Sequence, residues 1–359
     1  MIITRMDVQG VRNLLDVHIN PSRGVNLITG ANASGKTSLL EAIHILGQGR
    51  SFRSTRIGTI IHHQNDCLRV TGELGKRNEP ALHRIGIQRC LHKTRIRLDQ
   101  QDVQQISRIA RLLPIQLLTP ESIRLLEQGP SQRRKYLDWG LFHVEQSFMG
   151  AWQAFSRALR QRNAALRNGE KSRQIRVWDQ SLIENGEQIT RLRKTYVEKL
   201  RQPVNQVCLE LLGFSPELVY RQGWRQEISY QTALDAAVER DRLRGMTTVG
   251  PHRADLACLV DGNPVQEVFS RGQLKMLVAA LRIAQTSLLA PSQDKRPVFL
   301  IDDLAAELDS AHRRILLELL ANTAGQTFVT ATDPELIDLS PWKERRMFHV
   351  EHGKITEVV

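Results

Sequence analysis

The first third of the chain alternates between apolar and polar residues in short runs. Residues 2–11, 15–29, 67–75, 81–90 and 94–103 show this pattern, with polar turns between them. Alternation with a period of two is typical of half-buried β-strands. The pattern therefore predicts an antiparallel sheet, beside a strand that leads into a glycine-rich turn.

From about residue 121 the apolar residues instead recur every three or four positions, as on an amphipathic helix. In the first such stretch they are Leu137, Leu141, Val144, Phe148 and Trp152. A second stretch, residues 177–212, follows the polar break at 167–174. Two long helices joined by a short turn would form an antiparallel arm.

Extended structure returns at residues 217–224 and 254–265, where Asp261 and Gly262 suit a tight hairpin. The last hundred residues alternate helix and strand, as expected of an α/β lobe. The pattern thus predicts an α/β domain that is split by an inserted helical arm. The expected bounds are 1–113 for the first part of the lobe, 114–250 for the arm domain and 251–359 for the rest of the lobe.

Composition narrows the class of protein. The apolar fraction of 41% and charged fraction of 25% suit a folded soluble chain, and the apolar runs are too short to span a membrane. The N-terminus lacks the pattern of a secretory peptide, so we expect a cytoplasmic protein. Fifty Lys and Arg against 38 Asp and Glu give a net charge of +12, which suits a polyanionic partner such as nucleic acid.

The four cysteines are widely spaced and form no CxxC pair. They are Cys67, Cys90, Cys208 and Cys258. This spacing suggests neither a zinc site nor a disulfide framework, and we expect buried, reduced thiols. The adjacent His62 and His63 have no partner at ligand spacing, so we expect surface histidines and not a metal site.

Residues 25–46 read as strand, turn and helix, the order that a phosphate-binding P-loop requires. The turn matches GxxxxGK[ST], in which backbone N–H groups point at phosphate oxygens and the helix N-terminus favours an anion. Lys36 would contact the β and γ phosphates of ATP, and Thr37 would ligate Mg²⁺. The expected nucleotide-binding residues are Gly30, Ala31, Asn32, Ala33, Ser34, Gly35, Lys36, Thr37 and Ser38.

An acidic element complements the P-loop. The apolar run from Val298 to Ile301 is typical of a buried parallel strand, and Asp302 and Asp303 follow it directly. We expect Asp302 to hold Mg²⁺ and Asp303 to orient or deprotonate the attacking water. Lys36 and Asp303 are the expected catalytic residues.

The segment from residue 270 to 285, SRGQLKMLVAALRIAQ, resembles the signature of the ABC ATPase superfamily, and the AAELD run ending at Asp309 resembles its D-loop. In that superfamily the signature of one subunit closes on ATP held by another. The resemblance therefore implies an ATP-dependent homodimer in which Ser270, Gly272 and Gln273 contact nucleotide. Alternatively, Ser270 is an ordinary helix N-cap.

The short arm and several segments resemble the RecF family in particular. These segments are GANASGKTSLLEAIHILGQGRSFRS, TPESIRLLEQGPSQRRKYLDW, RQRNAALR, GPHRADL and SRGQLKML. The resemblance implies a P-loop ATPase head with a mixed β lobe and an inserted short helical arm. It also implies a weak ATPase that dimerises with ATP, binds DNA, and with RecO and RecR helps to place RecA at gaps and stalled forks.

One position departs from that family, and another departs from the ABC transporters. Val11 stands before Arg12 and Asn13 where the family commonly has Phe, although the resemblance still brings Arg12 close to the nucleotide. Thr332 and Asp333 end a strand where ABC transporters carry a switch histidine, which favours slow hydrolysis. A transport ATPase subunit and a DNA-binding protein whose nucleotide site only stabilises the fold are the alternative functions.

Basic residues mark two candidate DNA contacts. Residues 151–201 hold twelve Lys or Arg against five Asp or Glu, a net charge of +7. The basic residues noted there are Arg157, Arg160, Arg162, Arg167, Arg191, Arg193, Lys194, Lys199 and Arg201. Arg50, Arg53 and Arg56 form a second patch after the P-loop helix. Phosphate contacts of this kind carry little sequence preference, and a solvated helix face is the alternative for any single residue.

Two further sets of residues have a structural or an interface interpretation. His252 is either structural or part of a dimer interface. Trp139, Trp152 and Trp178 have the helical spacing of core residues.

Overall fold

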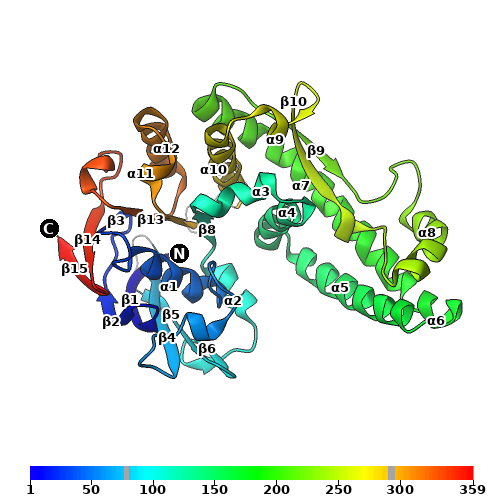
Figure 1. Cartoon of the computed structure of the whole chain (residues 1–359), viewed down its shortest axis with the longest axis horizontal. Helices are drawn as coiled ribbons and strands as arrows, with labels where there is room; N and C mark the ends of the chain where they lie inside the picture. Colours follow the sequence, from blue (N-terminus) through cyan, green and yellow to red (C-terminus); the bar gives the residue numbers. More distant parts are fainter. Residues whose placement is uncertain (77–80, 290–295, 359) are drawn as a thin grey trace. The chain divides into compact units, whose positions relative to one another are not determined.

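A computed structural model describes residues 1–76, 81–289 and 296–358 (Figure 1). The chain divides into two compact units. Unit 1 comprises Met1–Ser122 and Leu289–Val359, and unit 2 comprises Ile123–Leu288. Each unit is described by itself.

Unit 1 contains an antiparallel sheet with the strand order β2-β1-β4-β5-β6-β7. The strands are β1 (Ile2–Val11), β2 (Leu14–Ile19), β4 (Cys67–Gly75), β5 (Ala81–Cys90), β6 (Thr94–Leu98) and β7 (Gln101–Asp102). Buried residues, most of them apolar, alternate with more exposed residues along much of β1, β4 and β5, as in a sheet with one solvated face. The predicted antiparallel sheet is confirmed.

A second sheet in unit 1 has the order β15-β14-β3-β13-β12-β8, and only β15 runs antiparallel to its neighbour. Its strands are β3 (Val25–Thr29), β8 (Ile115–Leu118), β12 (Val298–Ile301), β13 (Gln326–Ala331), β14 (Arg345–Glu351) and β15 (Lys354–Val358). All five residues of β3 and all four of β12 are buried, which is typical of central parallel strands.

The helices of unit 1 pack around these sheets. They are α1 (Lys36–Gln48), α2 (Ile106–Leu112), α11 (Leu304–Glu307) and α12 (Ser310–Thr323), with 3₁₀ turns η1 (Ile57–Thr59), η2 (Pro120–Ile123) and η5 (Pro334–Leu336). α1 contacts strands of both sheets, and its Leu40, Ile43 and Leu46 are fully buried in one apolar core with them. The P-loop helix is therefore fixed by the packing of the whole unit.

Unit 2 is mostly helical. Its helices are α3 (Arg124–Glu127), α4 (Pro130–Val144), α5 (Gln146–Arg167), α6 (Ser172–Arg176), α7 (Asp179–Leu212), α8 (Tyr230–Arg244), α9 (Val265–Val268) and α10 (Arg271–Ser287), with the 3₁₀ turn η3 (Pro251–Arg253). A small antiparallel sheet has the order β11-β10-β9, formed by β9 (Glu217–Arg221), β10 (Asp255–Val260) and β11 (Asn263–Pro264). Asp261 and Gly262 both have positive φ in the predicted hairpin between β10 and β11.

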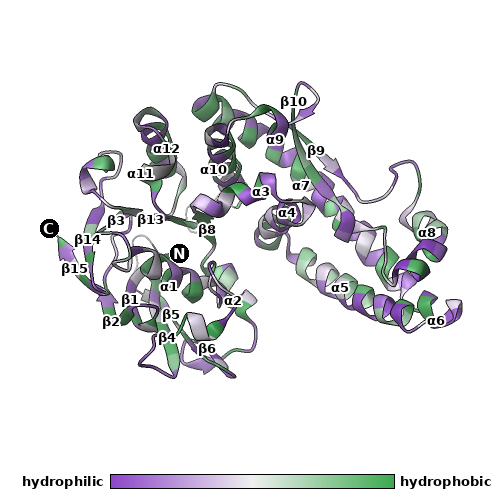
Figure 2. Cartoon of the chain, viewed as in Figure 1, coloured by the Kyte–Doolittle hydropathy of each residue, from purple (hydrophilic) through white to green (hydrophobic). Residues whose placement is uncertain are grey.

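The antiparallel arm consists of α5 and α7, which pack along each other with α6 in the connection (Figure 1). Polar and apolar positions alternate along both helices (Figure 2), in keeping with the helical period in the sequence. The first stretch is two helices and not one, because Glu145 adopts an extended conformation (φ −119°, ψ 111°) between α4 and α5. The sequence has neither Gly nor Pro at that point, so it gives no signal for this break.

The unit boundaries differ from the expected domain boundaries. β8 pairs with β12, which places residues 114–122 in unit 1. α10, expected in the ATPase lobe, packs on α7 and belongs to unit 2. Strand pairing and helix packing over long sequence separations set these boundaries, and local composition does not record them.

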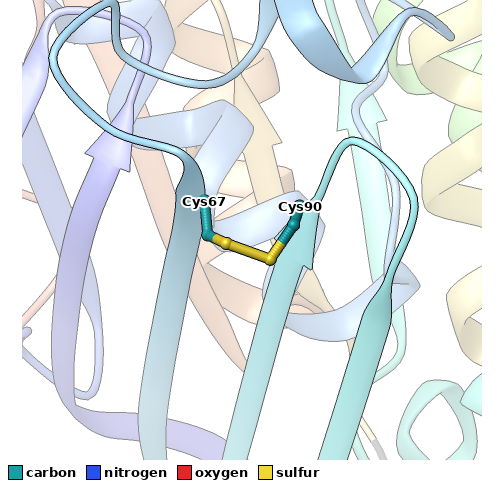
Figure 3. Close-up of a disulfide and its surroundings, with 2 residues drawn as sticks. All are labelled: Cys67 and Cys90. Carbon is teal, nitrogen blue, oxygen red and sulfur yellow. A yellow bond between two sulfur atoms is a disulfide. The ribbon is translucent and has the colours of Figure 1, made fainter.

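The cysteine prediction is half wrong. Cys67 and Cys90 lie directly opposite each other on β4 and β5 and form a disulfide (Figure 3), whereas we expected reduced thiols. The sequence separation of 23 residues between the two cysteines gave no indication of the disulfide, because this separation is set by the length of the β4-β5 hairpin. Cys208 and Cys258 are free and buried, as predicted.

Two aromatic or histidine positions also depart from expectation. Trp152 is 41% exposed, because it lies one position off the buried stripe of α5 that contains Ala151 and Phe155. His62 is buried, with its ring 4.3 Å from that of the exposed His63. The described residues contain no cluster of three or more His, Cys, Asp or Glu that could hold a metal.

His252 is structural within unit 2. Its Nε2 lies 2.9 Å from the Thr247 carbonyl oxygen, and its ring contacts that of Phe155. Burial is the main cause that lowers the pKa of His252 to about 4. Among the helices that the structure describes, none is both long and apolar enough to cross a lipid bilayer.

Candidate nucleotide site

The P-loop connects the carboxyl end of β3 to the first residue of α1. Gly30 (φ 145°) and Gly35 (φ 125°) adopt backbone conformations that residues with a side chain rarely adopt. A Cβ atom at Gly30 would also lie 2.2 Å from the carbonyl oxygen of Val350 on β14. Ala33 has a left-handed conformation (φ 63°), so the turn curls tightly enough to form a concave backbone surface.

Lys36 holds the P-loop from within. Its Nζ donates hydrogen bonds to the carbonyl oxygens of Gly30 (2.7 Å) and Ala31 (2.8 Å). Burial lowers the pKa of Lys36, while Asp303 and Asp302 oppose this change. The buried Ser34 Oγ has no hydrogen-bond partner among the residues that the structure describes. A ligand rich in acceptor oxygens, such as a polyphosphate, suits this set of donors.

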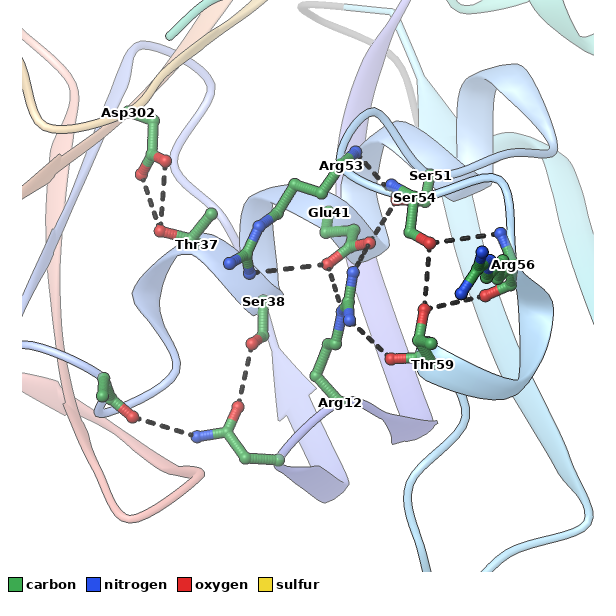
Figure 4. A network of polar contacts seen from close by, with 12 residues as sticks. Arg12, Thr37, Ser38, Glu41, Ser51, Arg53, Ser54, Arg56, Thr59 and Asp302 are labelled. Carbon is green, nitrogen blue, oxygen red and sulfur yellow. Dashed lines mark hydrogen bonds and ion pairs between the residues drawn. The ribbon is translucent and has the colours of Figure 1, made fainter. Parts of the chain in front are cut away.

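The carboxylate of Asp302 lies directly opposite the P-loop threonine. Thr37 Oγ1 donates to Asp302 Oδ1 at 3.0 Å (Figure 4), and Thr330 Oγ1 donates to the same oxygen at 2.9 Å. Burial raises the pKa of Asp302, and the two threonine hydroxyls oppose that rise. The hydroxyl and carboxylate are both ligands that Mg²⁺ prefers, so the pair fits the predicted metal site.

Asp303 has a left-handed backbone (φ 54°, ψ 46°) at the start of α11. Its N–H donates to Thr330 Oγ1 at 2.8 Å, so one hydroxyl fixes both aspartates. A non-glycine residue in this conformation is uncommon and is often found at functional sites. The fold thus brings together Lys36, Thr37, Asp302 and Asp303, as the sequence analysis expected.

Arg12 is held next to the P-loop helix by the buried carboxylate of Glu41 (Figure 4). Its Nε and Nη2 donate to the two oxygens of Glu41 at 2.9 and 3.0 Å, and its Nη1 donates to the Thr59 carbonyl. Ser51 Oγ also donates to Glu41, and Arg53 lies 3.9 Å from it. The described contacts of Arg12 are thus structural, and its expected contact with nucleotide stays a prediction.

Three residues that the sequence analysis did not select support the site. Asn13 donates to the Ser34 carbonyl (2.9 Å) and accepts from Ser38 Oγ (2.8 Å), which fixes the P-loop from the side. Glu41 and Thr330 have the roles described above. Glu41 was detectable as a charged residue within the apolar run from Leu39 to Ile43, whereas the sequence around β13 does not distinguish Thr330 from the nearby Thr327 and Thr332.

The signature-like residues lie at the start of α10 in unit 2. Ser270 caps the helix, because its Oγ accepts from the Gln273 N–H (3.3 Å) and its own N–H donates to Gln273 Oε1 (3.0 Å). Ser270 is therefore the N-cap of α10, and its expected contact with nucleotide stays a prediction. Gly272 is exposed, and an added Cβ there would meet nothing closer than Ser270 Oγ at 3.9 Å. Asp309 likewise caps α12 by accepting from the His312 N–H at 3.0 Å.

Two of the basic residues expected to contact DNA are structural. Arg162 is fully buried and forms ion pairs with Asp179 (2.9 Å) and Asp241 (2.7 Å). Arg193 is 3% exposed and pairs with Asp138. Sequence alone did not distinguish them, because their acidic partners are distant in the chain. The other candidates are exposed, namely Arg50, Arg53, Arg56, Arg157, Arg160, Arg167, Arg191, Lys194, Lys199 and Arg201.

The P-loop, the opposing aspartates and the parallel sheet define an ATPase of the P-loop class, with a head like those of SMC proteins. The chain belongs to the RecF family: the sequence model of the RecF/RecN/SMC N terminal domain matches residues 2–356. It is 42% identical over 361 residues to the DNA replication and repair protein RecF of Shewanella baltica (strain OS223), with 100% of both chains covered. Identity to the Shewanella oneidensis RecF is 41%, with the same coverage.

Solved structures agree with this assignment. The recombination mediator protein RecF-ATP in the RecFOR pathway matches with a TM-score of 0.86 and 25% identity over 99% of this chain and 97% of that chain. An SMC head bound to the C-winged helix domain of ScpA matches with a TM-score of 0.62 and 15% identity, over 100% and 98% of the two chains, which shows the fold alone. The predicted fold class is confirmed.

Proposed function

We propose that this chain is an ATP-dependent DNA-binding protein of replication and recombinational repair, and that it acts in the cytoplasm with RecO and RecR to help load RecA. Its RecF relatives carry the name of DNA replication and repair proteins, and a matched structure is that of RecF with ATP. The observation that carries the proposal is the facing of Thr37 and Asp302 across the P-loop. This pair is suited to Mg²⁺ bound to a polyphosphate such as ATP.

The roles of the residues follow from their contacts. The P-loop backbone from Gly30 to Ser38 would bind the phosphates, with Lys36 as the fixed cation, and Thr37 and Asp302 would hold Mg²⁺. ATP supplies a γ-phosphate whose hydrolysis is favourable. Asp303 would orient the attacking water, and its side chain is shorter than the glutamate usual in transporters, which agrees with slow hydrolysis.

We also propose that ATP brings two copies together through the start of α10. Ser270 is exposed and Gln273 is partly buried at a helix N-terminus, where backbone N–H groups favour an anion. Gly272 is the second residue of α10, and no contact among the residues that the structure describes requires a glycine there. Close approach by a phosphate of the partner subunit would explain why this position lacks a side chain.

The test is the molar mass by light scattering of Asp303→Asn, a variant expected to hydrolyse slowly, with Mg-ATP and with Mg-ADP. We expect a dimer with ATP and a monomer with ADP, because only ATP presents a γ-phosphate to the second subunit. Adding Ser270→Arg should abolish the ATP-dependent dimer and leave ATP binding intact. A monomer in both nucleotides, with ATP binding demonstrated, would contradict the proposed dimer.

If the nucleotide only stabilised the fold, Lys36→Met would lower the melting temperature of the protein. In that case the DNA affinity of the wild type would also not respond to ATP. The proposed switch requires the opposite: DNA affinity of the wild type that depends on ATP. Arg53 is suited to this coupling, since it lies beside Glu41 and its charge opposes the rise that burial causes in the pKa of Asp302. Equal DNA affinity with and without ATP, in the wild type and in Arg53→Ala, would contradict this coupling.

A further inference from the structure

A shallow basic pocket lies in unit 1 at the amino-terminal edge of the parallel sheet. It has a volume of about 360 Å³ and forms where the segment before β3 meets the segment before β14. The lining residues are Pro21, Ser22, Arg23, Lys343, Glu344, Arg345 and Arg346. Four of the seven are cationic and one is anionic, which is an unusual concentration of positive charge for one pocket.

This pocket is separate from the nucleotide site. Arg345 and Arg346 pair in register with Val25 and Asn26, the first residues of β3, whereas the P-loop follows the last residue of that strand. The five residues of β3 span roughly 16 Å at the usual rise of a strand. None of the residues expected to bind ATP or Mg²⁺ lines the pocket.

The backbone of the pocket is fixed by buried hydrogen bonds. Ser22 N–H donates to Asn26 Oδ1 (2.6 Å), and Asn26 Nδ2 donates back to the Ser22 carbonyl (3.0 Å). Gln326 Nε2 donates to the same carbonyl at 2.7 Å. On the other side, Val25 N–H donates to the Glu344 carbonyl at 3.1 Å. Both segments are therefore rigid, and the cations project from a preformed surface.

The cations differ in how far they are already neutralised. Arg346 pairs with Glu357 at 3.2 Å and donates to the Asn20 carbonyl, so it is mainly structural. Lys343 and Arg345 are exposed. Lys343 and Arg345 are thus the residues best placed to meet an anion from solvent.

We propose that this pocket binds a backbone phosphate of DNA and so supplies a contact on unit 1 in addition to the basic residues of the arm. The inference rests on the proposed DNA-binding function and adds a surface to it. A shallow pocket with exposed cations suits a phosphate on a strand that passes over the surface, whereas a free anion is usually enclosed more fully. Such a contact adds affinity without reading the base sequence.

The test uses the full chain and a 30-base-pair duplex, with affinity measured by fluorescence anisotropy from 50 to 300 mM NaCl. In the double variant Lys343→Gln/Arg345→Gln we expect about tenfold weaker binding near 100 mM salt. The slope of log affinity against log salt should fall by about two, one for each lost phosphate contact. Basal ATP hydrolysis should stay unchanged, because neither residue belongs to the nucleotide site.

The matched control is Lys93→Gln/Arg108→Gln, which removes two exposed charges from unit 1 away from the pocket. Equal loss of affinity in both double variants would overturn the proposal, because net charge alone would then explain the effect. The single variant Lys343→Gln, expected to lower the slope by about one, replaces the double variant if that one melts early.

Two further outcomes separate this inference from the proposed function. In the first, the wild type binds DNA, Arg157→Gln/Arg160→Gln weakens the binding and the pocket variant does not. This result would overturn the DNA contact at the pocket and keep the DNA-binding function. Absence of wild-type DNA binding would overturn both. Inorganic phosphate is the remaining probe: thermal stabilisation by phosphate that disappears in the pocket variant, with DNA affinity unchanged, would assign the pocket to a free anion and contradict the DNA contact.

Discussion

His252 shows how one buried residue makes the stability of unit 2 depend on pH. Burial lowers its pKa to about 4, against about 6.5 in an unfolded chain. Between these values the unfolded state binds a proton that the folded state does not bind. Stability is therefore fully present above pH 6.5 and decreases as the pH falls toward 4, with about 2 kcal/mol lost by pH 5.

The check is urea unfolding at pH 7.0 and pH 5.0, followed by tryptophan fluorescence, since four of the five tryptophans, Trp139, Trp152, Trp178 and Trp224, lie in unit 2. His252→Gln keeps a side chain that can donate to the Thr247 carbonyl but does not titrate. We expect the wild type to lose about 2 kcal/mol more than the variant between the two pH values. An equal loss in both would mean that His252 is accessible to protons in the folded state.

At the scale of elements, the β4-β5 hairpin carries a cross-link that can be tested directly. Without reductant, the denatured protein should show two reactive thiols, those of Cys208 and Cys258, and with reductant it should show four. Closing a loop of 23 residues stabilises a fold by up to about 3 kcal/mol in the chain-entropy account. Cys67→Ser/Cys90→Ser should therefore unfold at lower urea than the oxidised wild type.

Reduced wild type is the matched control for that experiment, and it should unfold together with the double variant. Four reactive thiols without reductant would show that the pair is not joined. The same melting behaviour for oxidised and reduced protein would show that the strand pairing already restricts the unfolded hairpin.

The elements that could be predicted are those with a strong local period. The P-loop, β12 and the helical character of the arm were predicted correctly. Their signals, a glycine pattern, a continuous apolar run and a helical period of apolar residues, can each be read from neighbouring residues. Glu145, Arg162 and the Cys67 pairing were missed, because each depends on a partner or a backbone bend that is set by tertiary packing. The same holds for Thr330, whose hydroxyl acquires its role only when β13 lies beside β12.

At the scale of the whole molecule, unit 2 joins the arm to the signature-like helix through buried hydrogen bonds. Gln285 on α10 donates to the Tyr136 carbonyl (2.9 Å) and to the Tyr196 hydroxyl (3.1 Å). The Tyr136 hydroxyl in turn donates to the Leu281 carbonyl at 2.7 Å. These bonds join α4, α7 and α10, so we infer that a displacement of the arm also displaces α10.

Under the proposed coupling of DNA binding to ATP, weakening this joint should reduce the stimulation of ATP hydrolysis by DNA while each ligand still binds. In Gln285→Leu we expect the ratio of DNA-stimulated to basal ATP hydrolysis to fall toward one, with affinities for ATP and for duplex DNA within about twofold of the wild type. Tyr196→Phe removes only one of the two bonds and should give a smaller change. Gln206→Leu, at an exposed position on α7, is the control for the chemical change. An unchanged ratio in Gln285→Leu, with the protein folded by its melting curve, would show that coupling does not pass through this joint.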